Sequence, residues 1–431
     1  MSSYLLFDAT YHRRVPYRQV VTPTERPPAP RAARRAAVPA NGARQSFLRE
    51  SNLSLVVRTV CASPVPLSRA GVAAATSMTR STASRLADDL VAAGLLDELA
   101  PPEVTGPGRP ATPLVAGAGP AALGLQVNAG AIAARVVDLR GRIVAQEIVA
   151  GDFVGSDPAA VLARLSALSH SVIDRMPLGA RLVGAGLALP GVVSAESGHL
   201  LLAPNLGWSG LHLHSALDPA ATGGLVPRIG NEADLAARTV AESVPGRPGD
   251  LTDFVYLSGE IGIGGSVVVA GVGMPGRHGW AGEIGHVTVD PDGPACPCGS
   301  TGCLERYAGR DAIFGGAGLP ASAGAHDLAR AVREGDTRAQ AAVGRAAWAL
   351  GVALAGVINV LDIPAVVLGG HLGQVADLLR PELERHLRSR TLSARWVTPD
   401  IVAAQADPAP GATGAAMLEL SGVLAHPVRW L

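Results

Sequence analysis

One histidine and three cysteines lie close together in this sequence, and these residue types at this spacing could hold a metal ion. His286 is followed by Cys296, Cys298 and Cys303. Imidazole and thiolate are ligands that Zn²⁺ prefers, and four of them complete its tetrahedral shell. A disulfide framework would spread its cysteines along the chain, whereas three of the four cysteines here fall within this one segment. The segment therefore predicts a closed, structural zinc site in a reducing compartment.

The N-terminal part of the chain has the pattern of a helix-turn-helix. Apolar residues recur at helical spacing over 53–60, which predicts a first helix ending near residue 63. Ser68 can cap a short second helix. After a turn at 76–78, Thr79 can cap a third helix, which Gly94 ends. Three helices with a tight turn before the last are typical of DNA-binding heads.

The polar face of the third helix carries the side chains that we expect to contact DNA. A helix fits the major groove, where residues near its N-terminus reach base edges and phosphates. The predicted DNA contacts on this helix are Arg80, Ser81, Thr82, Ser84 and Arg85. Any three-helix packing domain could share this pattern, so a purely structural interpretation stays open.

Residues 95–112 predict a small hairpin or wing beside the helices. Arg109 lies between Gly108 and Pro110, and a lone arginine on such an extended backbone could enter a minor groove. An arginine in a Gly/Pro loop can equally be a solvated residue. We therefore predict a winged helix-turn-helix over 43–115.

The charge distribution supports a DNA-binding head more than the total charge does. The chain has no net charge, but its first 115 residues contain fourteen arginines against eight acidic residues. Residues 1–42 are rich in Pro, Arg and Ala and predict a disordered basic tail. The tail could add non-specific attraction to phosphates, or could have no role.

Composition excludes several functional classes. The chain contains no lysine, which rules out a lysine-dependent phosphate loop or Schiff base. No uninterrupted apolar run reaches the length of a membrane span, and the start lacks the charge order of a signal peptide. We therefore expect a cytoplasmic protein with no membrane partner.

After a Pro/Gly/Ala linker at about 113–121, short apolar runs alternate with helical stretches. This alternation predicts an α/β fold with helices covering the sheets. The expected strands are 122–127, 133–137, 142–150, 183–189, 225–229, 254–257, 265–270 and 365–368, and the expected helices are 161–176, one from Glu232, and 339–361.

Six motifs in order give this region a resemblance to the ROK family of repressors and sugar kinases, and the head makes the chain similar to the xylose-repressor-like members. The matching segments are Leu189–Val193, Pro204–Trp208, Asn231–Ala233, Gly282–His286 with the cysteine cluster, Asn359–Gly370 and Gly411–Ala415. The resemblance implies an actin-like (ribonuclease H-like) fold of two lobes over 120–431. The small lobe would span about 120–231 plus the C-terminal helix, and the large lobe about 232–414.

The resemblance also implies a sugar site in the cleft between the lobes. Family sugar contacts carry over to Asn231, Glu232, Glu283, His286 and Glu305. Carboxylates accept hydrogen bonds from hydroxyls, and an amide both donates and accepts them. Alternatively, the glutamates at 283 and 305 could serve only to brace the zinc loop.

The positions that phosphoryl transfer requires depart from the kinases of the family. Those kinases have Asp-x-Gly-Gly-Thr after the first strand, where this chain has Gln-Val-Asn-Ala-Gly at 126–130. The second phosphate loop, Gly-Thr-Gly, is replaced by Glu260–Gly262, and the catalytic aspartate by Glu232. Side chains now stand where phosphate must approach the backbone, and the longer acid misplaces the base.

These observations predict a transcriptional regulator, most simply a repressor of carbohydrate-utilisation genes. Its partners would be an operator in double-stranded DNA and a monosaccharide or sugar phosphate effector, with the chain assembled as a homodimer or homotetramer. The kinase-like domain would be catalytically inactive. The alternative is an ATP-dependent sugar kinase with an appended head.

Overall fold

The computed structural model of the chain describes residues 41–101, 111–194 and 197–431. The predicted tail up to residue 40 and the predicted minor-groove residue Arg109 lie outside these ranges. Everything below refers to the described residues.

The head contains three helices and a three-stranded antiparallel sheet, in the order β1-β3-β2. The elements are α1 (Asn41–Ala62), β1 (Leu67–Ser68), α2 (Arg69–Thr76), α3 (Arg80–Ala92), β2 (Leu96–Glu98) and β3 (Pro113–Ala116). Both predicted caps are confirmed: Ser68 accepts from the Gly71 amide and Thr79 from the Thr82 amide.

The described helices and strands of the head span residues 41–116, against the predicted 43–115, so they overlap both the predicted tail and the predicted linker. Helix α1 begins at Asn41, two residues inside the segment 1–42 that we predicted to be disordered. Residues 113–116 are not part of a linker, because they form β3, which pairs with β2 and buries Leu114 completely. The linker predicted at 113–121 thus shrinks to 117–119, before the next strand begins at Pro120.

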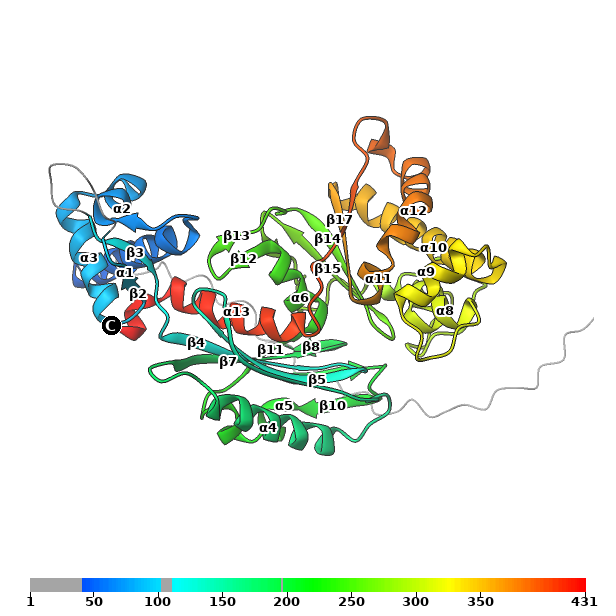
Figure 1. Cartoon of the computed structure of the whole chain (residues 1–431), viewed down its shortest axis with the longest axis horizontal. Coiled ribbons are helices and arrows are strands. Elements are labelled where there is room, and N and C mark those ends of the chain that lie inside the picture. The colour runs from blue at the N-terminus through cyan, green and yellow to red at the C-terminus, as the bar shows by residue number, and fades with distance from the viewer. Residues whose placement is uncertain (1–40, 102–110, 195–196) are drawn as a thin grey trace, which may run out of the picture. The chain divides into compact units, whose positions relative to one another are not determined.

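The small-lobe sheet has five strands in the order β11-β7-β4-β5-β6. These are β4 (Pro120–Val127), β5 (Ala131–Asp138), β6 (Ile143–Ala150), β7 (Arg181–Leu189) and β11 (Arg228–Asn231). Helix α4 (Pro158–Asp174) covers one face, and α13 (Pro410–Ala425), far away in sequence, covers the other (Figure 1). A Cβ at Gly124 would collide with the Ala412 carbonyl, so the glycine lets α13 approach the sheet closely.

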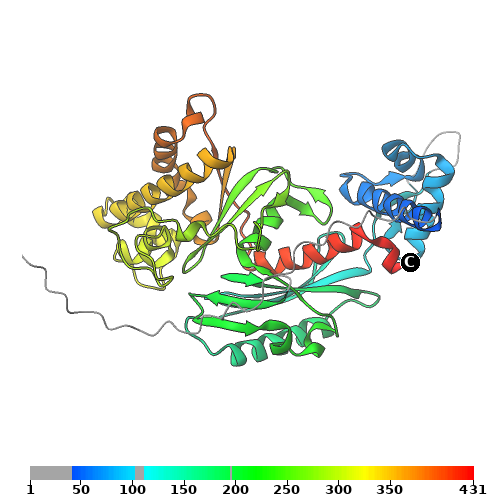
Figure 2. The same cartoon turned by 180° about the vertical axis from the view of Figure 1, so that it is seen from behind.

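The large-lobe sheet also has five strands, in the order β16-β15-β14-β17-β18, with α6 on one face (Figure 2). The strands are β14 (Phe254–Gly259), β15 (Ile263–Val269), β16 (Val272–Gly273), β17 (Ala365–Gly369) and β18 (Asp400–Ala403). Alternate residues of β14 point to opposite faces. Phe254 and Tyr256 pack on α6 (Glu232–Ala241), whereas Val255 and Leu257 join the core formed by α10 and α12.

Shorter elements complete the two lobes. Strands β8, β9 and β10 form a separate antiparallel sheet beside the small lobe. The remaining elements are β8 (Val192–Ser194), β9 (His199–Ala203), β10 (Trp208–His212), α5 (Leu213–Ala216), η1 (Pro219–Thr222), β12 (Glu242–Val244), β13 (Arg247–Pro248), η2 (Ile284–His286), α7 (Glu305–Ala308), α8 (Arg310–Gly316), α9 (Ala325–Arg333), α10 (Thr337–Leu361), α11 (Gly370–Gln374), α12 (Ala376–Arg390), η3 (Leu392–Arg395) and η4 (Pro427–Trp430).

The strands predicted from apolar runs are therefore present, with shifted ends. The strand expected at 225–229 begins only at Arg228. One helix, α10, is long and apolar enough to cross a membrane by length and composition, but its residues are mostly buried among other helices, as expected of a core helix.

Candidate functional site

The predicted metal ligands converge on one point. One ligand atom from each of His286, Cys296, Cys298 and Cys303 lies within 4.8 Å of all the others. The Sγ atoms of Cys298 and Cys303 are 3.7 Å apart, and Cys296 Sγ lies 3.7 Å from His286 Nδ1. Ligands held about 2.0–2.3 Å from a tetrahedral ion lie roughly 3.5–3.8 Å from one another. Two of the separations thus match a tetrahedral site, and the four side chains form a group that could hold a metal ion.

One carboxylate oxygen of Glu305 lies beside this cluster, and the other lies next to Gly262. Its Oε1 lies 3.0 Å from Cys296 Sγ and 3.8 Å from His286 Nδ1. Its Oε2 lies so close to Gly262 that a Cβ there would collide with it. The contacts with the predicted metal ligands therefore use only one of the two oxygens of Glu305.

All five residues predicted to contact sugar line a single pocket, which we call the carboxylate pocket. The turn between β4 and β5, the start of α6, the turn between β14 and β15, and the metal loop all contribute to its wall. Its lining residues are Asn128, Ala129, Pro190, Gly191, Pro204, Asn205, Asn231, Glu232, Ala233, Ser258, Glu260, Ile261, Gly262, Ile263, Gly264, Glu283, His286 and Glu305.

Most of the hydrogen-bonding groups of the Asn231 side chain bind to the backbone of the chain itself. Its side-chain oxygen accepts from the Ala233 and Asp234 amides and thereby caps α6. Its Nδ2 donates to the Gly191 carbonyl at 2.9 Å. One N–H remains for a ligand, so this residue mainly sets the position of its neighbour, Glu232.

Glu232 is a buried carboxyl held by two amide side chains. Its Oε1 accepts hydrogen bonds from Gln126 Nε2 at 2.8 Å and from Asn128 Nδ2 at 2.9 Å. Burial, and secondarily repulsion from Glu260, raises the pKa of Glu232 to about 8, although the Asn128 hydrogen bond acts in the opposite direction. The carboxyl therefore retains a proton at neutral pH.

Asn128 also fills the place where a phosphate would need free amides. Its Oδ1 accepts from the Gly130 amide at 3.0 Å and from the Ala131 amide at 2.7 Å. Backbone N–H groups in such a turn bind phosphate only when they are available to it. The turn between β4 and β5 is thus satisfied by its own side chain.

Two further carboxylates face the carboxylate pocket without partners. Within the described residues, the side chains of Glu260 and Glu283 make no hydrogen bond or ion pair. Burial raises the pKa of both groups, while Arg310 opposes the shift at Glu260 and His286 opposes it at Glu283. Carboxylate oxygens without donors are suited to accept hydrogen bonds from a ligand.

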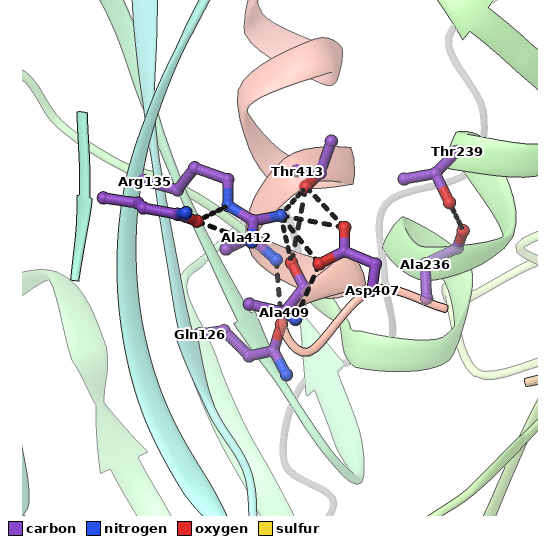
Figure 3. Close-up of polar contacts among 9 residues, drawn as sticks. Gln126, Arg135, Ala236, Thr239, Asp407, Ala409, Ala412 and Thr413 are labelled. Carbon is purple, nitrogen blue, oxygen red and sulfur yellow. Dashed lines mark hydrogen bonds and ion pairs between the residues drawn. The ribbon is translucent and has the colours of Figure 1, made fainter. Parts of the chain in front are cut away.

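A second buried polar cluster lies behind the pocket, at the start of α13. Gln126 Oε1 accepts from the Ala412 amide at 2.9 Å, which extends the Glu232 contacts to this helix. Figure 3 shows Arg135 beside them, where its Nη1 contacts Asp407 at 2.8 Å and also reaches Thr413. These contacts tie the segment before α13 to the small-lobe sheet.

The predicted DNA contacts of α3 lie on its outer surface. Arg80, Ser81 and Arg85 are exposed, and Thr82 and Ser84 are half-buried. No ion pair engages Arg80 or Arg85 among the described residues. By contrast, the acidic residues at the far end of the helix are neutralised, because Asp88 pairs with Arg69 and Asp89 with Arg49.

Sequence reasoning missed three contributors to the site. Asn205 lines the carboxylate pocket next to Gly262, and it was visible only as part of a matching motif. The contacts of Gln126 with Glu232 and of Arg135 with Asp407 carried no signal in the sequence, because each pair is more than 100 residues apart.

The sequence matches known proteins along most of its length. The ROK family model matches residues 122–421. A xylose repressor from Caldicellulosiruptor bescii is 25% identical over 398 residues, which cover 89% of this chain and 98% of the relative.

Two solved structures share the fold. A ROK family transcriptional regulator, a homologue of the E. coli MLC protein, has a TM-score of 0.71 at 23% identity and covers 89% of this chain and 98% of its own. A ROK family glucokinase from Streptomyces griseus, solved with glucose and AMPPNP, has a TM-score of 0.59 at 27% identity and covers 69% of this chain and 98% of its own. The regulator's coverage exceeds the span of the family match, so its likeness includes part of the head.

Proposed function

Because this chain belongs to the ROK family, we propose that it is a DNA-binding transcriptional repressor of carbohydrate-utilisation genes, controlled by a sugar in a kinase-like domain that does not phosphorylate it. The name of the C. bescii relative and the fold of the regulator structure support this proposal for the chain as a whole.

The observation that best supports the proposal is the set of hydrogen bonds that Asn128 makes. Phosphoryl transfer needs backbone amides around the phosphates and a base on the acceptor hydroxyl. Here Asn128 accepts from the amides of its own turn and donates to Glu232, the residue at the base position.

The alternative function, an ATP-dependent sugar kinase, draws support from the likeness to the S. griseus glucokinase. The carboxylate of Glu260 opposes it, since this residue replaces the first glycine of the second phosphate loop and would repel a polyphosphate. We therefore favour sensing over catalysis.

The head supplies the proposed contact to operator DNA. Arg80 and Arg85 have no acidic partner in the described part of the chain, so both guanidinium groups are available for phosphates or guanine edges. Ser81, Thr82 and Ser84 would add contacts along the same helix, and Arg109 in the wing would reach the minor groove.

Helix α13 offers a route from the carboxylate pocket to the head. Its first turn donates to Gln126, which holds Glu232. Near its other end, Leu420, Val423 and Leu424 share one apolar cluster with the core residues of the head. Ser54 in α1 also donates a hydrogen bond to the Leu424 carbonyl at 2.8 Å.

We propose that sugar binding between the lobes shifts α13 and with it the paired heads of an oligomer. The change in DNA affinity can then be no larger than the differential affinity of the sugar for the two states. A homodimer or homotetramer would present two heads to half-sites about one helical turn apart.

We assign Zn²⁺ to the His286/Cys296/Cys298/Cys303 cluster as a structural ion. The donor set of one imidazole and three thiols, together with the 3.7 Å separations, supports this assignment. Bound zinc would hold the thiols as thiolates and fix the loop that carries Glu283 and Glu305 to the carboxylate pocket. A cytoplasmic location would keep these thiols reduced.

Ligand-dependent thermal stability tests the sensing function. Free and phosphorylated sugars are screened against the parent protein and Glu283→Ala, and a true ligand should raise the melting temperature of the parent only. The same protein is then incubated with ATP and each stabilising sugar. Formation of sugar phosphate at ordinary enzymatic rates would overturn the sensor proposal in favour of the kinase.

A further inference from the structure

The charged groups of the carboxylate pocket all carry, or can carry, negative charge, apart from the predicted metal ligand His286. Four glutamates line it: Glu260, Glu283 and Glu305, together with Glu232, whose raised pKa keeps it largely protonated at neutral pH. No arginine is among its described lining residues, and the chain has no lysine. A sugar phosphate is a dianion at neutral pH, so it would meet repulsion here without a compensating cation.

Arg310, whose positive charge acts on Glu260, already has other contacts. Its Nη2 donates to the carbonyls of Ala321 at 3.1 Å and Ala323 at 2.7 Å. The guanidinium also lies over the Phe314 ring, 4.6 Å from its centroid. It does not line the carboxylate pocket, so a bound phosphate would have to draw it away from three contacts.

Backbone amides in two of the segments that line the pocket are also occupied. Asn128 accepts from the turn between β4 and β5, and Asn231 accepts from the first turn of α6. Helix N-termini and turns attract anions through free N–H groups, and both of these are capped by side chains of the chain itself.

The unpaired atoms of the pocket instead require hydrogen-bond donors. The carboxylates of Glu260 and Glu283 have no hydrogen-bond partner among the described residues. Sugar hydroxyls supply donors, whereas a phosphate adds acceptors and charge. Leaving such acceptors unpaired in a complex reduces affinity strongly.

We propose that the effector is a non-phosphorylated sugar and that Glu260 is a specificity-determining residue that excludes phosphorylated sugars. This inference rests on the proposed function and narrows its ligand class. Glu260 occupies the side of the pocket where the second phosphate loop of the kinases lies, so the residue that opposes a nucleotide also opposes a phosphosugar.

The test uses paired probes and the full-length, zinc-loaded chain. D-glucose, D-mannose and N-acetylglucosamine are each compared with their 6-phosphates, and D-xylose is added as a pentose. Thermal shift identifies binders, and calorimetry gives the dissociation constant of each pair. Glu260→Gln removes the charge at constant shape, and Glu334→Gln, an exposed residue in the same lobe, is the matched control.

We expect at least one neutral sugar to bind the parent, with its 6-phosphate at least 100-fold weaker where the pair exists. Glu260→Gln should reduce that ratio by about tenfold, since one nearby charge is removed. Glu334→Gln should leave it unchanged. If D-xylose is the only binder, charge-dependent exclusion is tested with D-xylonate as the anionic partner.

The failures are distinguishable. A 6-phosphate that binds as tightly as its parent sugar would overturn the inference while leaving a sugar-responsive regulator intact. If the ratio of the two dissociation constants is the same in Glu260→Gln as in the parent, Glu260 does not exclude phosphorylated sugars. If no probe of either kind binds, the proposed function fails, and the inference falls with it.

Discussion

Replacing Glu232 with glutamine should change how the stability of the chain depends on pH. Burial raises the pKa of Glu232 from 4.5 to about 8, so the folded chain holds a proton there that the unfolded chain releases at a lower pH. The stability associated with this proton is fully present below pH 4.5 and is lost as pH rises through about 8. Glutamine cannot titrate, and its oxygen can still accept from Gln126 and Asn128.

The size of the effect follows from one proton. Between about pH 5 and 7.5, the free energy of unfolding of the parent should fall by about 1.4 kcal/mol per pH unit relative to Glu232→Gln. Over the whole interval from pH 4.5 to 8 the difference is on the order of 5 kcal/mol, and the variant should be the more stable protein at pH 8.

Urea unfolding followed by tryptophan fluorescence at several pH values measures this difference. Trp208, which is buried in the small lobe, reports on the lobe that contains Gln126 and Asn128. The exposed Glu334→Gln variant should follow the parent throughout. If the free energy of unfolding depends on pH in the same way in the parent and in Glu232→Gln, Glu232 is ionised in the folded chain, and the argument from its burial is refuted.

Three further outcomes are expected. Cys298→Ser, or treatment of the parent with a chelator, should lower the melting temperature and abolish sugar binding, and added Zn²⁺ should restore both in the parent only; unchanged stability would argue against a structural ion. Gln126→Leu should leave sugar affinity within a few fold while reducing the effect of sugar on DNA affinity, and full coupling in this variant would exclude the route through α13. Arg80→Ala and Arg85→Ala should each weaken DNA binding and reduce its salt dependence by about one counterion, whereas the exposed Arg333→Ala control should do neither; equal loss in all three would point to non-specific charge.

Much of the fold could be predicted because its signals are local. Caps such as Ser68 and Thr79 act within three residues, and apolar runs at the strands reflect burial on both faces of a covered sheet. The errors fall where pairing partners decide the structure. Residues 113–116 appeared as a linker because their Pro/Ala composition conceals a short central strand, β3, which pairs with both β1 and β2.

The metal cluster was predictable for a similar reason, since its ligands lie within one segment of the sequence. The contacts that give the pocket its character were not. Gln126 meets Glu232 only because β4 and the start of α6 come together in the fold, and it meets Ala412 only because α13 returns to the same sheet. Such contacts depend on topology, which single-sequence patterns do not contain.

The central claim is that a sugar in the carboxylate pocket controls DNA binding without being phosphorylated. The most direct test selects DNA fragments that bind the protein from a random pool and measures their affinity by fluorescence anisotropy, with and without the sugar that stabilises the protein. The account predicts at least a fivefold change in the dissociation constant for the parent, none for Glu283→Ala, and recovery of the sugar unmodified after incubation with ATP. A stabilising sugar that leaves DNA affinity unchanged, or that is recovered as its phosphate, would contradict it.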